Sequence, residues 1–337
     1  MIISRRDVIQ SLVALGVIPV LGRTAGPVSA QEQPATVRVD YAYYNPSSLV
    51  LRRFGWLEEA LQEQGIGVEW VLSAGSNKAN EYLRSEAIDF GSTAGAAALL
   101  ARANGSPIKT VYIYSKPEWA ALVVPADSPI TAVADLKGKK IAATKGTDPY
   151  FFLLRSLNEA GLSGTDVEVV NLQHADGRTA LERGDVDAWA GLDPHMAASE
   201  LEAGSKLLYR NIDFNTYGFL NANEEFITQY PELTATVLQS YERARQWILE
   251  NPDEAAQILA EEAKISTEVA ERELFERTVL DIDPVPGETH AEVLRAVIPI
   301  FVAENQVKPG TDVEAVLAEL LAPEAATSVV TAAEPAA

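Results

Sequence analysis

The sequence predicts an α/β protein of two lobes, each with a mainly parallel sheet flanked by helices, followed by a helical C-terminal region. Up to about residue 223, short runs rich in β-branched and aromatic residues alternate with helical patterns, which is typical of βαβ units. After Glu224 the pattern is nearly continuous helix. The 307 residues that follow residue 30 of this 337-residue chain exceed the size at which one core usually divides, which favours two lobes.

The N-terminal segment has the three-part layout of an export signal. Ser4-Arg5-Arg6 precedes an apolar run at 12–21 and a small-residue site at Val28-Ser29-Ala30, where we expect cleavage. The paired arginines favour the twin-arginine route. Because such a signal is removed from the mature protein, we exclude residues 1–30 from the fold. The apolar run is shorter than the roughly 20 residues that span a bilayer, so we expect the mature chain to be soluble.

Eight apolar runs in the first two thirds of the chain predict strands, and helical patterns fall between most of them. The predicted strands are 36–44, 68–73, 88–92, 109–114, 121–124, 140–144, 167–172 and 186–190. The predicted helices are 49–64, 77–84, 94–104, 149–160, 177–183 and 195–203.

The C-terminal third predicts a series of helices. Pro231 and Pro252 suit the first turn of a helix, because proline lacks the amide that this turn leaves unpaired. Another helix should follow Ser266, and two more should cover 291–304 and 312–321. The tail at 323–337 is rich in Ala, Glu and Pro, and its composition predicts disorder.

The composition of the chain disfavours several kinds of partner and of functional site. The formal charge of −21 disfavours nucleic acid and anionic membranes as partners. The chain has no cysteine, so disulfides, thiolate zinc sites and a cysteine nucleophile are ruled out. No pair among its three histidines has helical metal-ligand spacing. We therefore predict no catalytic residue, no metal and no cofactor.

Six motifs follow one another along most of the chain. They lie at 75–77 (GSN), 88–93 (IDFGST), 124–142, 145–147 (KGT), 180–189 and 193–194 (DP). Together they resemble the aliphatic sulfonate, taurine and nitrate group of substrate-binding proteins of ABC importers. The resemblance implies a type II periplasmic-binding fold that captures a small organic anion between its lobes. It also implies a periplasmic monomer that passes this ligand to a membrane permease and, through it, serves an ATPase.

The resemblance further implies how the chain is divided. Residues 31–125 and 215–322 would form the first lobe and 126–214 the second. Two crossing strands, near 121–124 and 217–221, would form the hinge between the lobes.

Three strand-to-helix turns are candidates for holding an anion. Ligands of open α/β sheets bind beyond the carboxyl ends of the strands, where helix N-termini present unpaired amides and partial positive charge. The turns are 75–77, 92–94 and 146–148, and their small hydroxyl residues add donors. Each could instead serve only as a helix cap. A sulfonate is always ionised and asks for donors alone.

Aromatic side chains at strand edges are candidates for the walls of this site. Tyr44 and Asn45 leave the first strand, and Trp119 precedes a crossing strand, whereas Phe151 and Phe152 are expected in the core. Asp193 belongs to the Asp-Pro motif. The predicted ligand-binding residues are Tyr44, Asn45, Ser76, Asn77, Ser92, Thr93, Ala94, Trp119, Gly146, Thr147, Asp148 and Asp193.

Asp148 has two interpretations. It could cap a helix that has Pro149 at its first position, or it could accept hydrogen bonds from an amine or hydroxyl of the ligand. The second would favour a zwitterionic or heterocyclic ligand, taurine-like or pyrimidine-like, over a plain alkanesulfonate. Leu192 also departs from relatives that carry tryptophan before Asp-Pro.

His174 and His195 are expected at the surface or in helix caps, and Arg178 could pair with Asp176 or reach the cleft.

Two other functions stay open. An enzyme of pyrimidine-precursor synthesis with the same fold is a less favoured alternative. A receptor module without transport is another.

Overall fold

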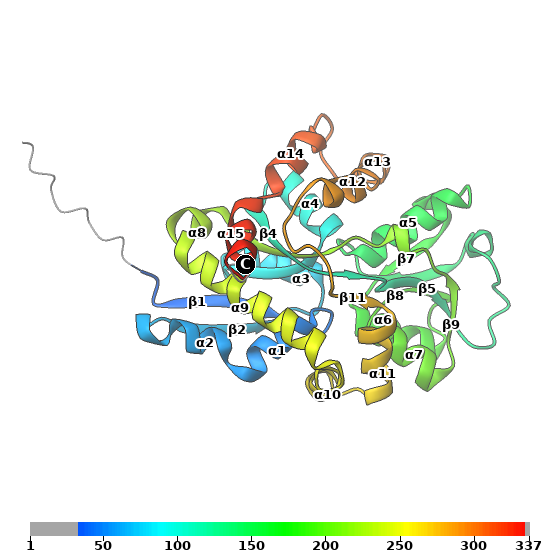
Figure 1. Ribbon diagram of the computed structural model, residues 1–337. Coiled ribbons are helices and arrows are strands. Elements are labelled where there is room, and N and C mark those ends of the chain that lie inside the picture. Colours follow the sequence, from blue (N-terminus) through cyan, green and yellow to red (C-terminus); the bar gives the residue numbers. More distant parts are fainter. Residues whose placement is uncertain (1–32, 334–337) are drawn as a thin grey trace, which may run out of the picture. The chain divides into compact units, whose positions relative to one another are not determined.

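Two β-sheets carry the fold of residues 33–333, the part that this computed structural model describes. The first sheet has the strand order β11-β4-β10-β3-β1-β2 and the second has β7-β6-β8-β5-β9 (Figure 1). Helices surround both sheets, and the predicted α/β class is confirmed. The export signal predicted at 1–30 lies outside the described residues.

The first sheet is assembled from both ends of the chain. Its strands are β1 (Thr36–Tyr41), β2 (Gly67–Leu72), β3 (Phe90–Ala94), β4 (Ile108–Pro117), β10 (Gly218–Asn223) and β11 (Thr278–Val279). β1 pairs in parallel with β2 and β3, whereas β10 runs antiparallel between β3 and β4. The return strand β10 thus closes the sheet after the second sheet has been completed. We call this sheet and the helices packed on it the first lobe.

The second sheet is formed by one continuous stretch. Its strands are β5 (Ala120–Val124), β6 (Lys140–Ala143), β7 (Glu168–Asn171), β8 (Ala188–Leu192) and β9 (Lys206–Tyr209). β6 pairs in parallel with β7 and β8, and β5 runs antiparallel between β8 and β9. This sheet and its helices form the second lobe, which begins at Ala120 rather than at residue 126.

Helices cover both sheets. In the second lobe they are α5 (Asp148–Glu159), α6 (His174–Arg183) and α7 (His195–Ala203). In the first lobe they are α1 (Pro46–Phe54), α2 (Trp56–Leu61), α3 (Ser76–Arg84), α4 (Gly95–Ala103), α8 (Glu224–Gln229), α9 (Pro231–Glu250), α10 (Pro252–Ala263), α11 (Thr267–Glu271), α12 (Glu288–Arg295), α13 (Ile298–Ala303), α14 (Val313–Leu320) and α15 (Pro323–Ala333). The short turns are η1 (Gln62–Gln64), η2 (Val133–Leu136), η3 (Gly164–Asp166), η4 (Ile212–Phe214) and the π-helical η5 (Arg272–Glu276).

The helix predicted at 49–64 is interrupted. Gly55 adopts a left-handed conformation with φ of 66°, and its amide donates to the carbonyls of Leu51 and Arg52. Glycine takes this conformation without a steric cost, so α1 ends here and α2 begins in a new direction.

The disorder predicted for 323–337 is wrong for residues 323–333. They form α15, in which Ala326 and Val329 are buried against α9 and β4. The amide of Ala322 donates to the carbonyl of Thr110 at 3.0 Å and fixes the start of this helix. Composition alone missed it because its buried side chains are alanine and valine, whose small apolar area does not mark a helix clearly.

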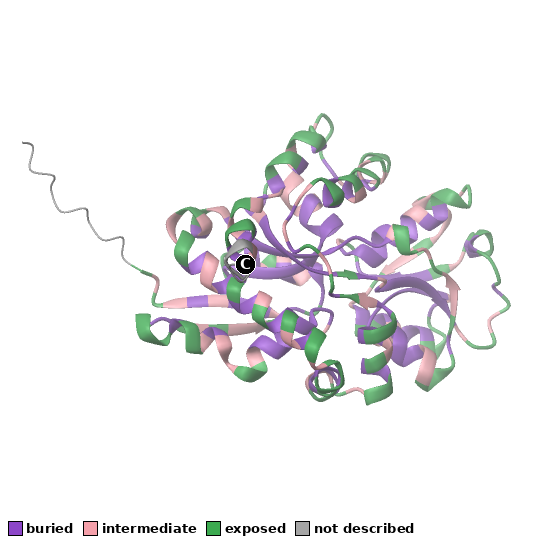
Figure 2. Ribbon diagram, viewed as in Figure 1, coloured by how far each residue is buried: buried purple, intermediate pink, exposed green. Residues whose placement is uncertain are grey.

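The hydrophobic core lies along the strands of the two sheets. Figure 2 shows that the inner strands of both sheets are largely buried, while the edge strands and the outward sides of the helices are partly exposed. The chain crosses between the sheets twice, after β4 at residues 118–119 and after β9 at residues 210–217. No helix among residues 33–333 has the length and apolar character needed to cross a membrane.

Candidate functional site

A small cavity lies where the two lobes meet beside the crossings. It comprises about 190 Å³ of space, part of it open to solvent. Its lining residues are Tyr44, Ser76, Ala94, Trp119, Thr147, Asp148, Pro149 and Leu192. Both lobes contribute, and six of the predicted residues meet here, although they are up to about a hundred positions apart in the sequence.

Three helices begin at this cavity, and none has a side-chain cap. Their N-cap residues are Gly75 for α3, Ala94 for α4 and Thr147 for α5. The Thr147 hydroxyl donates to the carbonyl of Thr144 at 2.6 Å instead of capping α5. Helix N-termini attract anions because their first amides are unpaired and carry the positive end of the helix dipole.

The protein itself supplies acceptors for the amides at the start of α4, whereas the first amide of α3 and that of α5 are left without one. Ala94 donates to the Ser76 hydroxyl at 2.9 Å, and Ala96 donates to the Thr216 hydroxyl at 3.2 Å. The amides of Ser76 and Asn77 in α3 and of Asp148 in α5 have no hydrogen-bond acceptor among residues 33–333, and Pro149 has no amide hydrogen. The donors left for a ligand therefore come from one helix in each lobe.

Asp148 is not a helix cap, because Thr147 occupies the N-cap and Asp148 is the first residue of α5. Its carboxylate accepts a hydrogen bond from Trp119 Nε1 at 3.1 Å and another from the amide of Thr216 at 2.7 Å. The Thr216 hydroxyl donates to the same group at 2.8 Å. Burial raises the pKa of Asp148 above its ordinary value. The protein itself therefore supplies the partners of this carboxylate.

Two aromatic side chains line the cavity as expected. Tyr44 and Trp119 meet edge to face with ring centroids 6.0 Å apart, and the Tyr44 hydroxyl donates to the carbonyl of Ser92 at 3.0 Å. Burial raises the pKa of Tyr44 well above its ordinary value, so its hydroxyl stays neutral. Phe151 and Phe152 are buried in the core, where they were expected.

Several predicted residues support the site without lining it. Asn45 caps α1 and donates to the Ser92 hydroxyl at 2.7 Å. Ser92 in turn donates to Asp40 Oδ1 at 2.8 Å. The Thr93 hydroxyl faces away from the cavity and accepts a hydrogen bond from Asn221 at 2.7 Å. Asn77 and Gly146 line a neighbouring groove instead.

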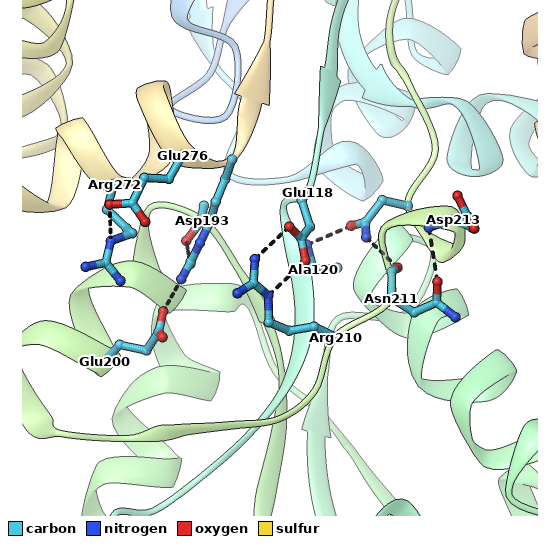
Figure 3. A network of polar contacts seen from close by, with 11 residues as sticks. Glu118, Ala120, Asp193, Glu200, Arg210, Asn211, Asp213, Arg272 and Glu276 are labelled. Atoms are coloured by element: carbon cyan, nitrogen blue, oxygen red, sulfur yellow. Dashed lines mark hydrogen bonds and ion pairs between the residues drawn. The ribbon is translucent and has the colours of Figure 1, made fainter.

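Asp193 lies behind the cavity in a buried ion pair. Its carboxylate is 3.1 Å from the guanidinium of Arg277, which also pairs with Glu200. Burial raises the pKa of Asp193 to about 6, against the lowering effect of Arg277. Figure 3 shows this network beside the crossings, where Glu118 pairs with Arg210.

The histidines lie outside the cavity. His174 is buried, so the expectation of a surface or capping position is wrong for it. Arg178 does not reach the cleft but pairs with Glu182 and Glu202. Within the described residues, no three His, Cys, Asp or Glu side chains gather closely enough to hold a metal ion.

Sequence reasoning missed Thr216 and Arg277. Thr216 follows the crossing after β9, and nothing in its neighbourhood distinguishes it from a residue of an ordinary loop. Arg277 follows an acid-rich stretch, where an exposed ion pair would have been the usual interpretation. Pro149 and Leu192 were noted in the sequence but not assigned to the site.

Comparison with known proteins agrees with the fold. The sequence pattern of the family described as NMT1/THI5 like matches residues 60–255. An aliphatic sulfonates-binding protein of Escherichia coli (strain K12) is 30% identical over 284 residues, which covers 84% of this chain and 88% of that protein.

Two solved structures of sulfonate-binding proteins superpose on this chain. The alkanesulfonate-binding protein SsuA from Xanthomonas axonopodis pv. citri, bound to MOPS, superposes with a TM-score of 0.76 at 26% identity and covers 85% of this chain and 98% of its own. The periplasmic aliphatic sulphonate binding protein SsuA from Escherichia coli superposes with a TM-score of 0.72 at 27% identity and covers 86% and 93%. This chain therefore belongs to the NMT1/THI5-like family, together with these sulfonate-binding relatives.

Proposed function

We propose that this protein is the periplasmic solute-binding component of an ABC importer and that it captures a small sulfonate-like anion in the interlobe cavity. One observation carries the proposal: the uncapped N-termini of α3 and α5, one from each lobe, face the same cavity. A sulfonate offers only acceptors, and these amides offer only donors. An anion held by both helices favours the closed arrangement of the lobes over an open one.

The hydrogen bonds that Asp148 already accepts favour a plain sulfonate over a zwitterion as the ligand. Its carboxylate is already bound by Trp119 and Thr216, so it needs no amine from the ligand. Tyr44, Trp119 and Leu192 supply apolar area for an alkyl group. We therefore expect ethanesulfonate to bind more tightly than taurine, its amino analogue.

Export and transport complete the proposal. The signal at 1–30 would direct the chain to the periplasm, and two relatives from Escherichia coli are named as sulfonate-binding proteins, one of them as periplasmic. The closed, loaded monomer would dock on a membrane permease that an ATPase drives. Binding without turnover predicts that NMR recovers the sulfonate unchanged after long incubation with the protein.

A thermal-shift comparison tests the anion. Ethanesulfonate and the neutral ethanesulfonamide have nearly the same shape and differ in charge. At about a hundred times its dissociation constant, a ligand stabilises the native state by roughly 2.7 kcal/mol, which raises the melting temperature by several degrees. The sulfonate should produce this shift and the sulfonamide should not. A shift with neutral compounds alone would contradict the proposal.

A further inference from the structure

A buried histidine of the second lobe contacts the first lobe beside the helix α3, which begins at the cavity. His174 is the first residue of α6, and its side chain belongs to a residue that is only 1% exposed. A Cβ atom on Gly75, the residue before α3, would lie 3.0 Å from His174 Nε2. The imidazole is therefore part of the surface on which the two lobes meet.

Hydrogen bonds fix the position of the proton on this ring. The Thr144 hydroxyl donates its single hydrogen to the carbonyl of Leu172 at 2.7 Å. Toward His174 Nδ1, which is 3.2 Å away, the same hydroxyl can only accept, so Nδ1 carries the hydrogen. Nε2 is then an unprotonated nitrogen, and it is buried without a hydrogen-bond partner among residues 33–333. A second proton would have to bind at Nε2, against Gly75.

The surroundings of the ring disfavour a positive charge. His174 opens α6, where the positive end of the helix dipole lies, and it faces the N-terminus of α3 as well. Burial, with a smaller contribution from the neighbouring His195, lowers the pKa of His174 from 6.5 to about 3. The ring is therefore neutral while the two lobes stay together.

Acidic side chains do not offset this effect. The charged or titratable residues near the ring, on its own helix and on the elements around it, are Asp176 and Arg178 of α6, Lys78 and Glu81 of α3, Lys145 after β6 and His195 of α7. Asp176 is exposed, and Glu81 pairs with Lys78 at 2.6 Å. No carboxylate among residues 33–333 raises the pKa of His174.

We infer that His174 makes the closure of the lobes, and with it sulfonate binding, dependent on pH, because the lobes close only around a neutral imidazole. The inference rests on the proposed function, since sulfonate binding is what reports closure. In an open arrangement Gly75 no longer covers the ring, and water reaches Nε2. The open form then takes up a proton with the ordinary pKa of histidine, which closure must remove.

The direction of the effect follows from the two forms. Between about pH 3 and pH 6.5 the open form binds more protons than the closed form. The contribution of neutral His174 to closure is therefore complete above pH 6.5 and is lost as the pH falls below this value. A sulfonate stays ionised throughout this range, so the ligand itself adds no pH dependence.

Isothermal titration with ethanesulfonate at pH 7.5 and pH 5.5 tests the inference. The wild type should bind about tenfold more weakly at pH 5.5, because only about a tenth of the open molecules then carries a neutral His174. His174→Asn keeps an N–H group that can donate to Thr144 but does not titrate. Its affinity should change less than about twofold between the two pH values.

The other two histidines provide matched controls. His195→Asn and His290→Asn should keep the tenfold loss of the wild type at pH 5.5, and melting temperatures verify that each variant folds. The buried carboxyl groups of Asp40 and Asp193 have pKa values of about 6 and titrate in the same range. They are present in every variant, so the comparison isolates the contribution of His174.

Proton NMR of the imidazole C2–H provides a measurement that does not depend on affinity. The signal that His174→Asn lacks belongs to His174. In the ligand-free protein it should titrate near pH 6.5, and in the protein saturated with ethanesulfonate it should show no titration above about pH 4.5.

The outcomes separate the two proposals. If the wild type binds ethanesulfonate equally at both pH values, or His174→Asn weakens at pH 5.5 as the wild type does, the inference is wrong and the proposed function stands. A His174 signal that stays neutral down to pH 4.5 without ligand would also overturn the inference. If the wild type binds no sulfonate at pH 7.5, the proposed function itself fails and the inference fails with it.

Discussion

The carboxylate of Asp148 accepts two hydrogen bonds from Thr216, one from the amide at 2.7 Å and one from the hydroxyl at 2.8 Å. Asp148 opens α5 of the second lobe, and Thr216 lies on the crossing that leads into β10. Trp119, on the other crossing, donates to the same carboxylate. One side chain thus joins the start of α5 to both connections between the lobes.

Replacing Asp148 by asparagine should destabilise the protein. An amide places an NH₂ group against donors, so at least one of the three hydrogen bonds is lost in a buried place. We expect the free energy of unfolding in urea to fall by about 1–3 kcal/mol. Asp127→Asn, in an exposed turn, should change it little. Equal stability of the two variants would show that Asp148 does not join the crossings.

The ion pair between Arg277 and Asp193 predicts a second, larger effect. Both side chains are almost fully buried, so Arg277→Met leaves an unpaired carboxylate in the interior. Breaking a buried pair in this way costs about 3–5 kcal/mol of unfolding free energy. Arg272→Met removes the exposed pair with Glu276 and should cost at most about 1 kcal/mol. Similar losses in both variants would contradict a special role for Arg277.

Gly75 provides a steric test of closure. A Cβ atom there would lie 3.0 Å from His174 Nε2 of the second lobe and 2.9 Å from Asn77 Oδ1. Its backbone is extended, so alanine adds no backbone strain and acts through these two side-chain contacts. We expect Gly75→Ala to weaken sulfonate binding about fivefold or more, because crowding of this kind costs about 1–3 kcal/mol in the closed form.

Two controls accompany this variant in the titration. Gly67→Ala, whose Cβ would meet its nearest neighbour at 3.5 Å, should bind normally. Adding His174→Ala to Gly75→Ala should restore part of the affinity by making room. Weak binding that persists unchanged in the double variant would indicate that His174 is not the obstacle.

The sequence predicted the sheets well because most of their strands are runs of apolar, often β-branched residues. The eight predicted runs correspond to β1–β8, and the strand predicted at 217–221 is β10. The prediction that 121–124 and 217–221 cross between the lobes is wrong, because β5 pairs only within the second sheet and β10 only within the first. β9 and β11 were missed. β11 has only two residues, and β9 contains no β-branched residue, so neither gives a strong strand signal.

The candidate site was predicted less completely. Ser76, Thr147 and Trp119 were found because each follows a strand or lies beside one, a position that the sequence reveals. Thr93 looked equivalent, but its hydroxyl faces Asn221 of β10, a neighbour that only the sheet order determines. Thr216 and Arg277 act through contacts 68 and 84 positions away in the chain, which no local pattern encodes.

The buried carboxyl group of Asp40 should make the stability of the protein depend on pH. It is fully buried beneath the cavity, and its Oδ1 accepts hydrogen bonds from the Ser92 amide and hydroxyl, both at 2.8 Å. Burial raises its pKa from 3.8 to about 6. Between these two values the folded state binds more protons than the unfolded state. The contribution of protonated Asp40 to the stability of the folded state is therefore complete below pH 3.8 and is lost as the pH rises through about 6.

Asp40→Asn removes this titration and keeps the shape, with the amide oxygen able to accept both bonds from Ser92. The difference in unfolding free energy between pH 4.5 and pH 7.5, measured by urea denaturation, should shift by about 2 kcal/mol toward relatively greater stability at pH 7.5. Asp135→Asn is the opposite control, because backbone hydrogen bonds from Thr131 and Ala132 lower the pKa of that exposed carboxylate. Its titration lies below the tested range, so the difference should stay as in the wild type. An Asp40→Asn profile parallel to the wild type would mean that Asp40 is ionised with an ordinary pKa in the folded protein.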